Sequence, residues 1–187
     1  RMKLADKTAV ITGAGRGLGY AVAQAMSRQG AKVTIMSPVL DELEAAARRI
    51  TENGGECLVF QGDVSQPQSV AEMIRQTKER FLTIDVLVNN AGIIGPVRFL
   101  EDADVASWEK TIAVNLNGAF YCSREMVPVM ARQKQGKIIN ISSGLGQMAF
   151  PKFCAYSVAK AGIIQLTRSL SAELKEFNIQ VNAIDPG

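Results

Sequence analysis

Short apolar segments alternate with amphipathic segments along the 187-residue chain, and this alternation restricts the possible folds more than any other feature. Apolar runs of strand length, separated by stretches with helical periodicity, are typical of repeated βα units. Such units predict a parallel sheet with helices on both faces, and right-handed crossovers make the sheet doubly wound. We therefore expect one α/β domain over residues 1–187. Arg1 precedes Met2 and is interpreted as an expression remnant outside the fold.

The expected elements follow the pattern of a Rossmann-type sheet in three α/β/α layers, whose ligands bind at the carboxyl ends of the strands. The predicted strands are Thr8–Ile11, Lys32–Met36, Cys57–Phe60, Ile84–Val88, Lys137–Ile141 and Ile179–Ile184. The predicted helices are Leu18–Gln29, Pro38–Asn53, one that opens at Ser65, Ala103–Arg132 and Ala155–Glu176.

Glycine, serine and proline mark the expected helix ends. Gly30 follows the first predicted helix as a C-terminal cap. Ser37-Pro38 has the pattern of an N-cap followed by proline at the first helical position. Ser65, with Gln68 three residues later, fits a capping box.

Composition and charge exclude several classes of function. The formal net charge is only +3 and the basic residues are scattered, so we expect no nucleic-acid-binding face. No apolar run of about 18 residues is present, which argues against a membrane span, and Lys3, Asp6 and Lys7 interrupt any signal-peptide pattern. The three cysteines form no C-x-x-C pair, which favours free thiols in a reducing, cytoplasmic setting. Because histidine is absent, we expect neither a His-based metal site nor a Ser-His or Cys-His nucleophile.

A glycine-rich loop follows the first predicted strand. Gly13, Gly17 and Gly19 have the spacing G-x-x-x-G-x-G, which differs from the usual G-x-G-x-x-G fingerprint. A strand before and a helix after are nevertheless the right setting for a pyrophosphate at a helix N-terminus. The alternative is an ordinary βα turn. The predicted cofactor-binding residues of this loop are Gly13, Gly15, Arg16, Gly17, Leu18 and Gly19.

The residue at the end of the second strand bears on the choice of cofactor. NAD-binding sites commonly carry an acid there, but Ser37 occupies that place, and Asp41 is expected inside the first helical turn as a structural residue. A neutral Ser37 leaves room for a 2′-phosphate, with which Arg16 can pair. This pattern favours NADP(H) over NAD(H). Arg16 is alternatively a solvated loop cation.

Tyr156 and Lys160 lie four residues apart at the start of a predicted helix, so their side chains share one face. An unperturbed tyrosine has a pKa near 10, but one ammonium about 4 Å away stabilises a phenolate by about 4 kcal/mol at an effective dielectric of ~20. A Y-x-x-x-K pair alone is common by chance. Ser143, just past the fifth strand, is placed to hydrogen-bond a substrate carbonyl or the oxyanion formed from it, with Ser142 as its competitor.

Taken together, these motifs and their spacing resemble the short-chain dehydrogenase/reductase family over the whole chain. The motifs that carry the resemblance are Thr12–Gly19, Asn89-Asn90-Ala91-Gly92, Asn115, Ser143, Tyr156 with Lys160, and Pro186-Gly187.

The resemblance implies a role for each matching residue. Tyr156 exchanges a proton with the carbonyl or alcohol, while Lys160 stabilises its phenolate and binds the nicotinamide ribose. Ser143 positions the carbonyl oxygen, and Asn115 holds a water in a proton relay to Lys160. The remaining implied cofactor contacts are Asp63 and Val64 at the adenine, Asn90, Ala91 and Gly92 along the cleft, and Pro186 and Gly187 near the nicotinamide.

The implied activity is hydride transfer between a nicotinamide cofactor and a small-molecule carbonyl or secondary alcohol. Arg16 and Ser37 resemble those of 3-oxoacyl-thioester reductases, while sugar or polyol dehydrogenases and steroid-type reductases stay open. The rivals from other classes are a non-catalytic NADP(H) sensor or scaffold and a nucleotide-cofactor transferase.

Family members commonly form homodimers or homotetramers through the two long helices. They also continue past the Pro-Gly, so the C-terminal part of the family fold is expected to be missing here. The stripe Ile163, Leu166, Leu170 and Leu174 suits either an interface or a core. Gln147–Phe153 is expected to line part of the substrate pocket.

Overall fold

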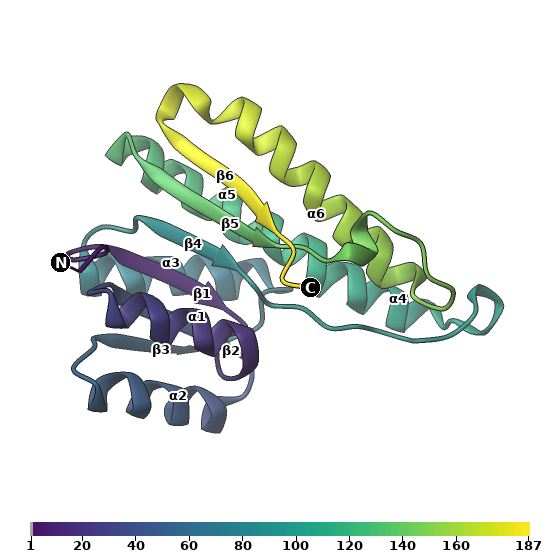
Figure 1. Cartoon of the computed structure of the whole chain (residues 1–187), viewed down its shortest axis with the longest axis horizontal. Coiled ribbons are helices and arrows are strands. Elements are labelled where there is room, and N and C mark those ends of the chain that lie inside the picture. Colours follow the sequence, from purple (N-terminus) through teal and green to yellow (C-terminus); the bar gives the residue numbers. More distant parts are fainter. Residues whose placement is uncertain (1) are drawn as a thin grey trace.

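The computed structural model describes residues 2–187, so Arg1 lies outside the described residues. Six parallel strands form one sheet in the order β3-β2-β1-β4-β5-β6 (Figure 1). The strands are β1 (Thr8–Thr12), β2 (Lys32–Ser37), β3 (Cys57–Gln61), β4 (Val86–Asn89), β5 (Gly136–Ile141) and β6 (Ile179–Ile184). The helices are α1 (Gly17–Arg28), α2 (Leu40–Glu52), α3 (Pro67–Phe81), α4 (Val105–Ile112), α5 (Gly118–Gln133) and α6 (Cys154–Glu173).

Alternate residues of β1 enter two separate cores, one on each face of the sheet. Ala9 and Ile11 pack in one cluster with buried residues of α1 and α2, whereas Val10 packs in the other with residues of α3 and α5. Figure 1 shows these two helix pairs on opposite sides of the sheet. The predicted doubly wound, three-layer architecture is therefore confirmed.

Part of the apolar stripe along α6 is in the core, whereas Leu166 is only half-buried and lies in neither core cluster. Ile163 and Leu174 are buried, and Leu170 packs against the cluster that contains Val10. The opposite face of β6 has no helix over it among residues 2–187, and Ile184 is 47 % exposed there.

The order of the strands places a crevice at the centre of the sheet. β1 pairs with β2 on one side and with β4 on the other. The crossovers from these strands run to opposite faces, so the loops after β1 and β4 separate at their carboxyl ends. The glycine loop, the Asn90 segment and the serines after β5 meet at this edge.

Two predicted helix starts are wrong. α2 begins at Leu40, because Ser37 is still the last residue of β2 and its carbonyl accepts a hydrogen bond from Gly62 N at 3.0 Å. α3 begins at Pro67, because Ser65 N instead donates to the Asp63 carboxylate at 2.8 Å in a turn before the helix. Ser37, Pro38 and Ser65 do lie close to the two helix starts, but none of them is an N-cap or a first helical residue.

The predicted continuous helix over 103–132 is interrupted by a π-helical turn at Ala113–Asn117. The predicted C-terminal cap at Gly30 is confirmed, since Gly30 has φ +92 and donates to Ser27 O at 2.8 Å. Asp41 lies in the first turn of α2 as expected.

No helix among residues 2–187 is long and apolar enough to cross a membrane. Over the same residues, no group of three or more acidic, cysteine or histidine side chains is placed to hold a metal ion.

Candidate cofactor and catalytic site

The glycine loop after β1 is fastened to the loop after β4. The Thr12 hydroxyl accepts hydrogen bonds from Asn90 N and Ala91 N, both at 3.1 Å. The Asn90 amide donates to Thr12 O at 2.9 Å and to Gly13 O at 3.0 Å. Asn90 was expected to line the cofactor cleft, and its amide hydrogens hold the walls of that cleft together.

Two of the loop glycines allow conformations and approaches that a side chain would prevent. Gly13 has φ +63, in the left-handed region that favours glycine. A Cβ on Gly19 would press on the carbonyl oxygen of Gly13 and the amide of Asn90. The loop can therefore keep its tight turn with exposed backbone only with glycine at these positions.

A cavity of about 580 Å³ lies along this loop. It extends from the end of β2 across the glycine loop to the start of the loop after β4. Of the predicted cofactor residues, it is lined by Gly13, Gly15, Arg16, Leu18, Gly19, Ser37, Asp63, Val64, Asn90, Ala91 and Gly92, while Gly17 does not line it.

Four charged side chains line this cavity, those of Arg16, Glu42, Asp63 and Lys110. Asp63 uses one carboxylate oxygen to accept from Ser65 N. Arg16 lies with its Nε 3.5 Å from Glu42 Oε1 on α2. Lys110 comes from α4. The sequence reasoning missed Glu42 and Lys110. A charged residue on the exposed turn of a helix carries no local signal of a site.

A second cavity of about 220 Å³ adjoins the first. The two share Leu18, Asn90, Gly92 and Ile93 as lining residues. The second cavity also contains the predicted residues Ser143, Tyr156, Lys160, Pro186 and Gly187, together with Ser142. The structure thus brings the expected cofactor residues other than Gly17, and the expected catalytic residues other than Asn115, together along one edge of the sheet.

Lys160 is almost completely buried beside Tyr156. Its side chain is on α6, 4 % of the residue is exposed, and Nζ lies 5.6 Å from the centre of the Tyr156 ring. Nζ donates a hydrogen bond to Ile141 O at 2.7 Å. Burial lowers the pKa of Lys160 to about 8, because a charged amine loses its hydration there. A buried ammonium in a cavity is expensive for stability and is typical of functional sites.

The two candidate serines differ in their surroundings. Ser142 is buried, and its hydroxyl donates to Lys160 O at 3.4 Å. Ser143 is half-buried, and its hydroxyl accepts only a 3.3 Å bond from Leu145 N among the described contacts. The Ser143 hydroxyl therefore keeps its proton available for a ligand.

Asn115 lies in the π-helical turn and is 2 % exposed. Its amide donates to Ile93 O at 2.8 Å and to Thr111 O at 2.9 Å, while its Oδ1 accepts from Ile93 N at 3.2 Å. Both amide hydrogens are thus committed to the main chain, and the side chain holds the loop after β4 in place. A Cβ on Gly92 would lie 2.7 Å from Asn115 Oδ1 and 3.7 Å from Lys160 Nζ.

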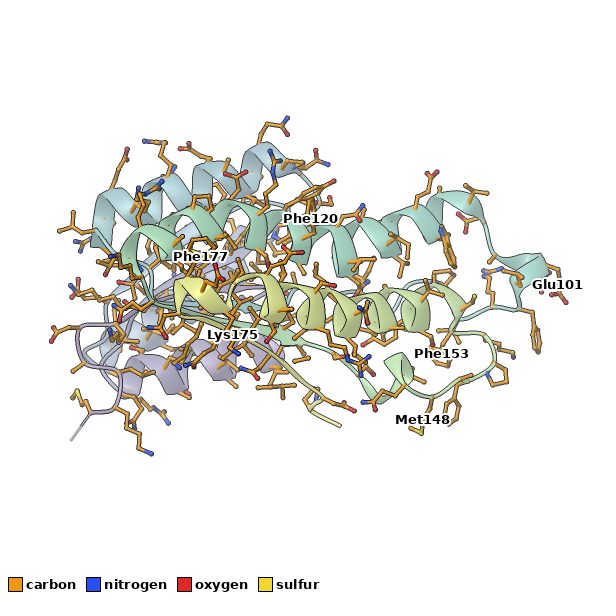
Figure 2. The ribbon with its side chains drawn as sticks, turned by 90° about the horizontal axis from the view of Figure 1, so that it is seen from above. Glu101, Phe120, Met148, Phe153, Lys175 and Phe177 are labelled. Carbon is orange, nitrogen blue, oxygen red and sulfur yellow. The ribbon has the colours of Figure 1, made fainter. Side chains whose placement is uncertain are left out.

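The segment Gln147–Phe153 does not line either cavity. Met148 and Phe150 are 60 % and 57 % exposed, and Figure 2 shows Met148 and Phe153 towards the same end of the molecule as Glu101. Lys152 O accepts a hydrogen bond from Arg98 N at 3.1 Å, which joins the segment to a part of the loop after β4 that lines neither cavity.

Comparisons with known proteins agree with this arrangement. A sequence model described as short chain dehydrogenase matches residues 7–187. A 3-oxoacyl-[acyl-carrier-protein] reductase of Synechocystis sp. is 38 % identical over 185 residues, which cover 98 % of this chain and 74 % of that protein. A D-beta-hydroxybutyrate dehydrogenase of Rhizobium meliloti is 37 % identical, over 97 % of this chain and 70 % of that protein.

A similar solved structure is that of NAD+-bound xylitol dehydrogenase. It superimposes with a TM-score of 0.96 at 31 % sequence identity, and the match covers 99 % of this chain and 71 % of that one.

Proposed function

The chain belongs to the short-chain dehydrogenase family of oxidoreductases, and we propose that it transfers a hydride between a nicotinamide cofactor and a carbonyl or secondary alcohol. The observation that carries this proposal is the buried Lys160 next to Tyr156, in a cavity that adjoins the glycine-loop cleft.

The size of the larger cavity and the bare backbone beside it suit a dinucleotide. Its volume is about 580 Å³, within the range of small-molecule sites. The loop above it needs glycine at positions 13 and 19, and a Cβ there would contact neighbouring backbone. Bare backbone at the start of α1 gives phosphate groups N–H donors and the positive end of a helix dipole. A bound nicotinamide cofactor supplies or accepts the hydride.

The protein's own groups handle the proton. Tyr156 donates its phenolic proton to the carbonyl oxygen during reduction and takes it back from the alcohol during oxidation. The Lys160 ammonium stabilises the negative charge left on Tyr156; two opposite unit charges about 5 Å apart attract by about 3 kcal/mol at an effective dielectric of ~20. Ser143 donates a hydrogen bond to the same carbonyl oxygen and orients it.

The end of the cleft at β2 supports NADP(H) over NAD(H). Ser37 is neutral, 8 % exposed, and accepts a hydrogen bond from Val39 N at 3.3 Å. A phosphate on the ribose would therefore meet no acidic side chain at the last residue of β2 itself. Arg16, with a side chain 84 % exposed, can turn towards a 2′-phosphate.

We propose a 3-oxoacyl thioester as the leading substrate class, supported by the 38 % identity with the Synechocystis reductase. A polyol is the alternative, supported by the TM-score of 0.96 with xylitol dehydrogenase.

The test is a fluorescence titration with NADPH and NADH, followed by turnover assays on a short 3-oxoacyl thioester and on xylitol. We expect NADPH to bind more tightly and Tyr156→Phe to abolish turnover while it keeps cofactor binding. Tyr121→Phe, on α5 away from both cavities, is the matched control and retains turnover. If the wild type binds neither cofactor, the proposal is overturned. Turnover by Tyr156→Phe overturns the role assigned to Tyr156, and cofactor binding by the wild type without any turnover indicates a non-catalytic binding protein.

A further inference from the structure

Arg16 and Glu42 form an ion pair at one end of the larger cavity. Arg16 Nε lies 3.5 Å from Glu42 Oε1, and both residues line the cavity together with Ser37. The two residues come from different elements, the glycine loop and the first turn of α2. The backbone of the loop is close as well, since a Cβ on Gly15 would lie 3.0 Å from Glu42 Cβ.

We propose that Glu42 is a cofactor-selecting residue, which lowers the preference for NADP(H) by competing with the 2′-phosphate for Arg16. This inference rests on the proposed nicotinamide-dependent function. A 2′-phosphate that pairs with Arg16 has to displace the Glu42 carboxylate from it. A cofactor with a free 2′-hydroxyl leaves the pair intact.

The exposure of the pair supports a role in selection instead of fold stability. The Arg16 side chain is 84 % exposed and that of Glu42 is 35 % exposed. An exposed ion pair contributes little to folding because water and salt screen it. Arg16 can therefore readily exchange Glu42 for another anion. A phosphate carries more negative charge than a carboxylate and competes well for Arg16.

The geometry also separates Glu42 from its acidic neighbours on the helix. Asp41 and Glu44 are exposed and line neither cavity, whereas Glu42 is half-buried against the glycine loop. A mutation at Glu44 thus removes the same charge from the same helix without touching Arg16. It is the matched control.

The experiment measures dissociation constants for NADPH and NADH by fluorescence for the wild type, Glu42→Gln and Glu44→Gln. We expect Glu42→Gln to raise the NADPH-over-NADH preference about three- to tenfold, with Glu44→Gln close to the wild type. In about 1 M salt, where the Debye length is about 3 Å, the difference should shrink. If Glu42→Gln leaves the NADPH-over-NADH preference unchanged, or if Glu42→Gln and Glu44→Gln change it equally, the inference is overturned. The proposed function still stands in that case, provided that the proteins bind the cofactors.

A double-mutant cycle tests whether the effect passes through Arg16. In an Arg16→Gln background, Glu42→Gln should change the cofactor preference by less than about twofold, because there is no longer a cation for which to compete. A full-sized effect in that background overturns the competition with Arg16. If no protein in the series binds NADPH or NADH, the proposed function fails, and the inference fails with it.

Discussion

Lys160 Nζ lies 5.6 Å from the centre of the Tyr156 ring while it donates a hydrogen bond to Ile141 O at 2.7 Å. The carbonyl at the end of β5 thus fixes the ammonium beside the tyrosine. Lys160 is thereby held close to the Tyr156 ring, and its burial leaves little water around the amine.

The first prediction concerns the charge on Lys160. Lys160→Met keeps the length of the side chain but removes the cation, so we expect turnover to fall about 100-fold, the equivalent of about 3 kcal/mol of lost phenolate stabilisation. The melting temperature should stay the same or rise, because replacing a buried charge by an apolar group is often stabilising. Steady-state assays and thermal unfolding measure both quantities.

Lys175→Met is the control for this variant, since Lys175 is exposed in the turn after α6. Equal losses of turnover in the two variants would contradict the role assigned to Lys160.

The second prediction concerns pH. The pKa of Lys160 is lowered from 10.5 to about 8 by burial, so the folded protein loses this proton at lower pH than the unfolded chain does. Stability should therefore rise between about pH 8 and about pH 10.5, by at most about 3 kcal/mol, while turnover falls as the ammonium is lost. Denaturant unfolding and turnover rates are measured over this pH range for the wild type and for Lys160→Met. The wild type should become more stable and less active as the pH rises. Parallel changes in the two quantities would refute it.

The third prediction concerns Thr12, whose hydroxyl accepts hydrogen bonds from Asn90 N and Ala91 N. Thr12→Val leaves both N–H groups without this partner, so we expect a loss of about 2–4 kcal/mol in the free energy of unfolding and weaker cofactor binding. Thr8→Val is the control on the same strand. Thr8 Oγ1 is buried with no hydrogen-bond partner among residues 2–187, so that variant should be neutral or stabilising. A larger loss in Thr8→Val would disprove the argument.

The fourth prediction compares two glycines of the loop. A Cβ on Gly19 would press on Gly13 and Asn90, whereas one on Gly17 would have nothing within 4 Å. Gly19→Ala should lower cofactor affinity at least tenfold and destabilise the fold by about 1–3 kcal/mol. Gly17→Ala is strained only by its φ of +57, so its free energy of unfolding should fall by about 1–2 kcal/mol. Cofactor titration and denaturant unfolding of both variants test whether Gly19→Ala is the more damaging substitution. A larger loss in Gly17→Ala would rule out the steric explanation.

The fifth prediction concerns Ser37 at the end of β2. Ser37→Asp places an acid beside the position expected for the ribose, so NADPH binding should weaken at least tenfold while NADH binding is kept or improved. Ser65→Asp serves as the control, because Ser65 lines neither cavity. An unchanged ratio of the two affinities in Ser37→Asp would mean that Ser37 is not near the ribose.

The predictions made from the sequence were best where the signal is local. The alternation of strands and helices identified all six strands of the sheet to within a few residues. Two of the errors were at helix starts, where Ser37 and Ser65 had the right residue type but made strand and turn hydrogen bonds instead.

The sequence by itself determined the layered βα architecture, the glycine loop and the pairing of Tyr156 with Lys160, because each depends on residues close together in the chain. Only the tertiary structure decided that Asn90 binds the glycine loop at Thr12, 78 residues away. It also decided that the Asn115 amide donates both of its hydrogen bonds to main-chain carbonyls, and that Glu42 lies next to Arg16. The physical reason is that periodicity and turn preferences act within a few residues. Contacts between distant residues depend on how whole elements pack.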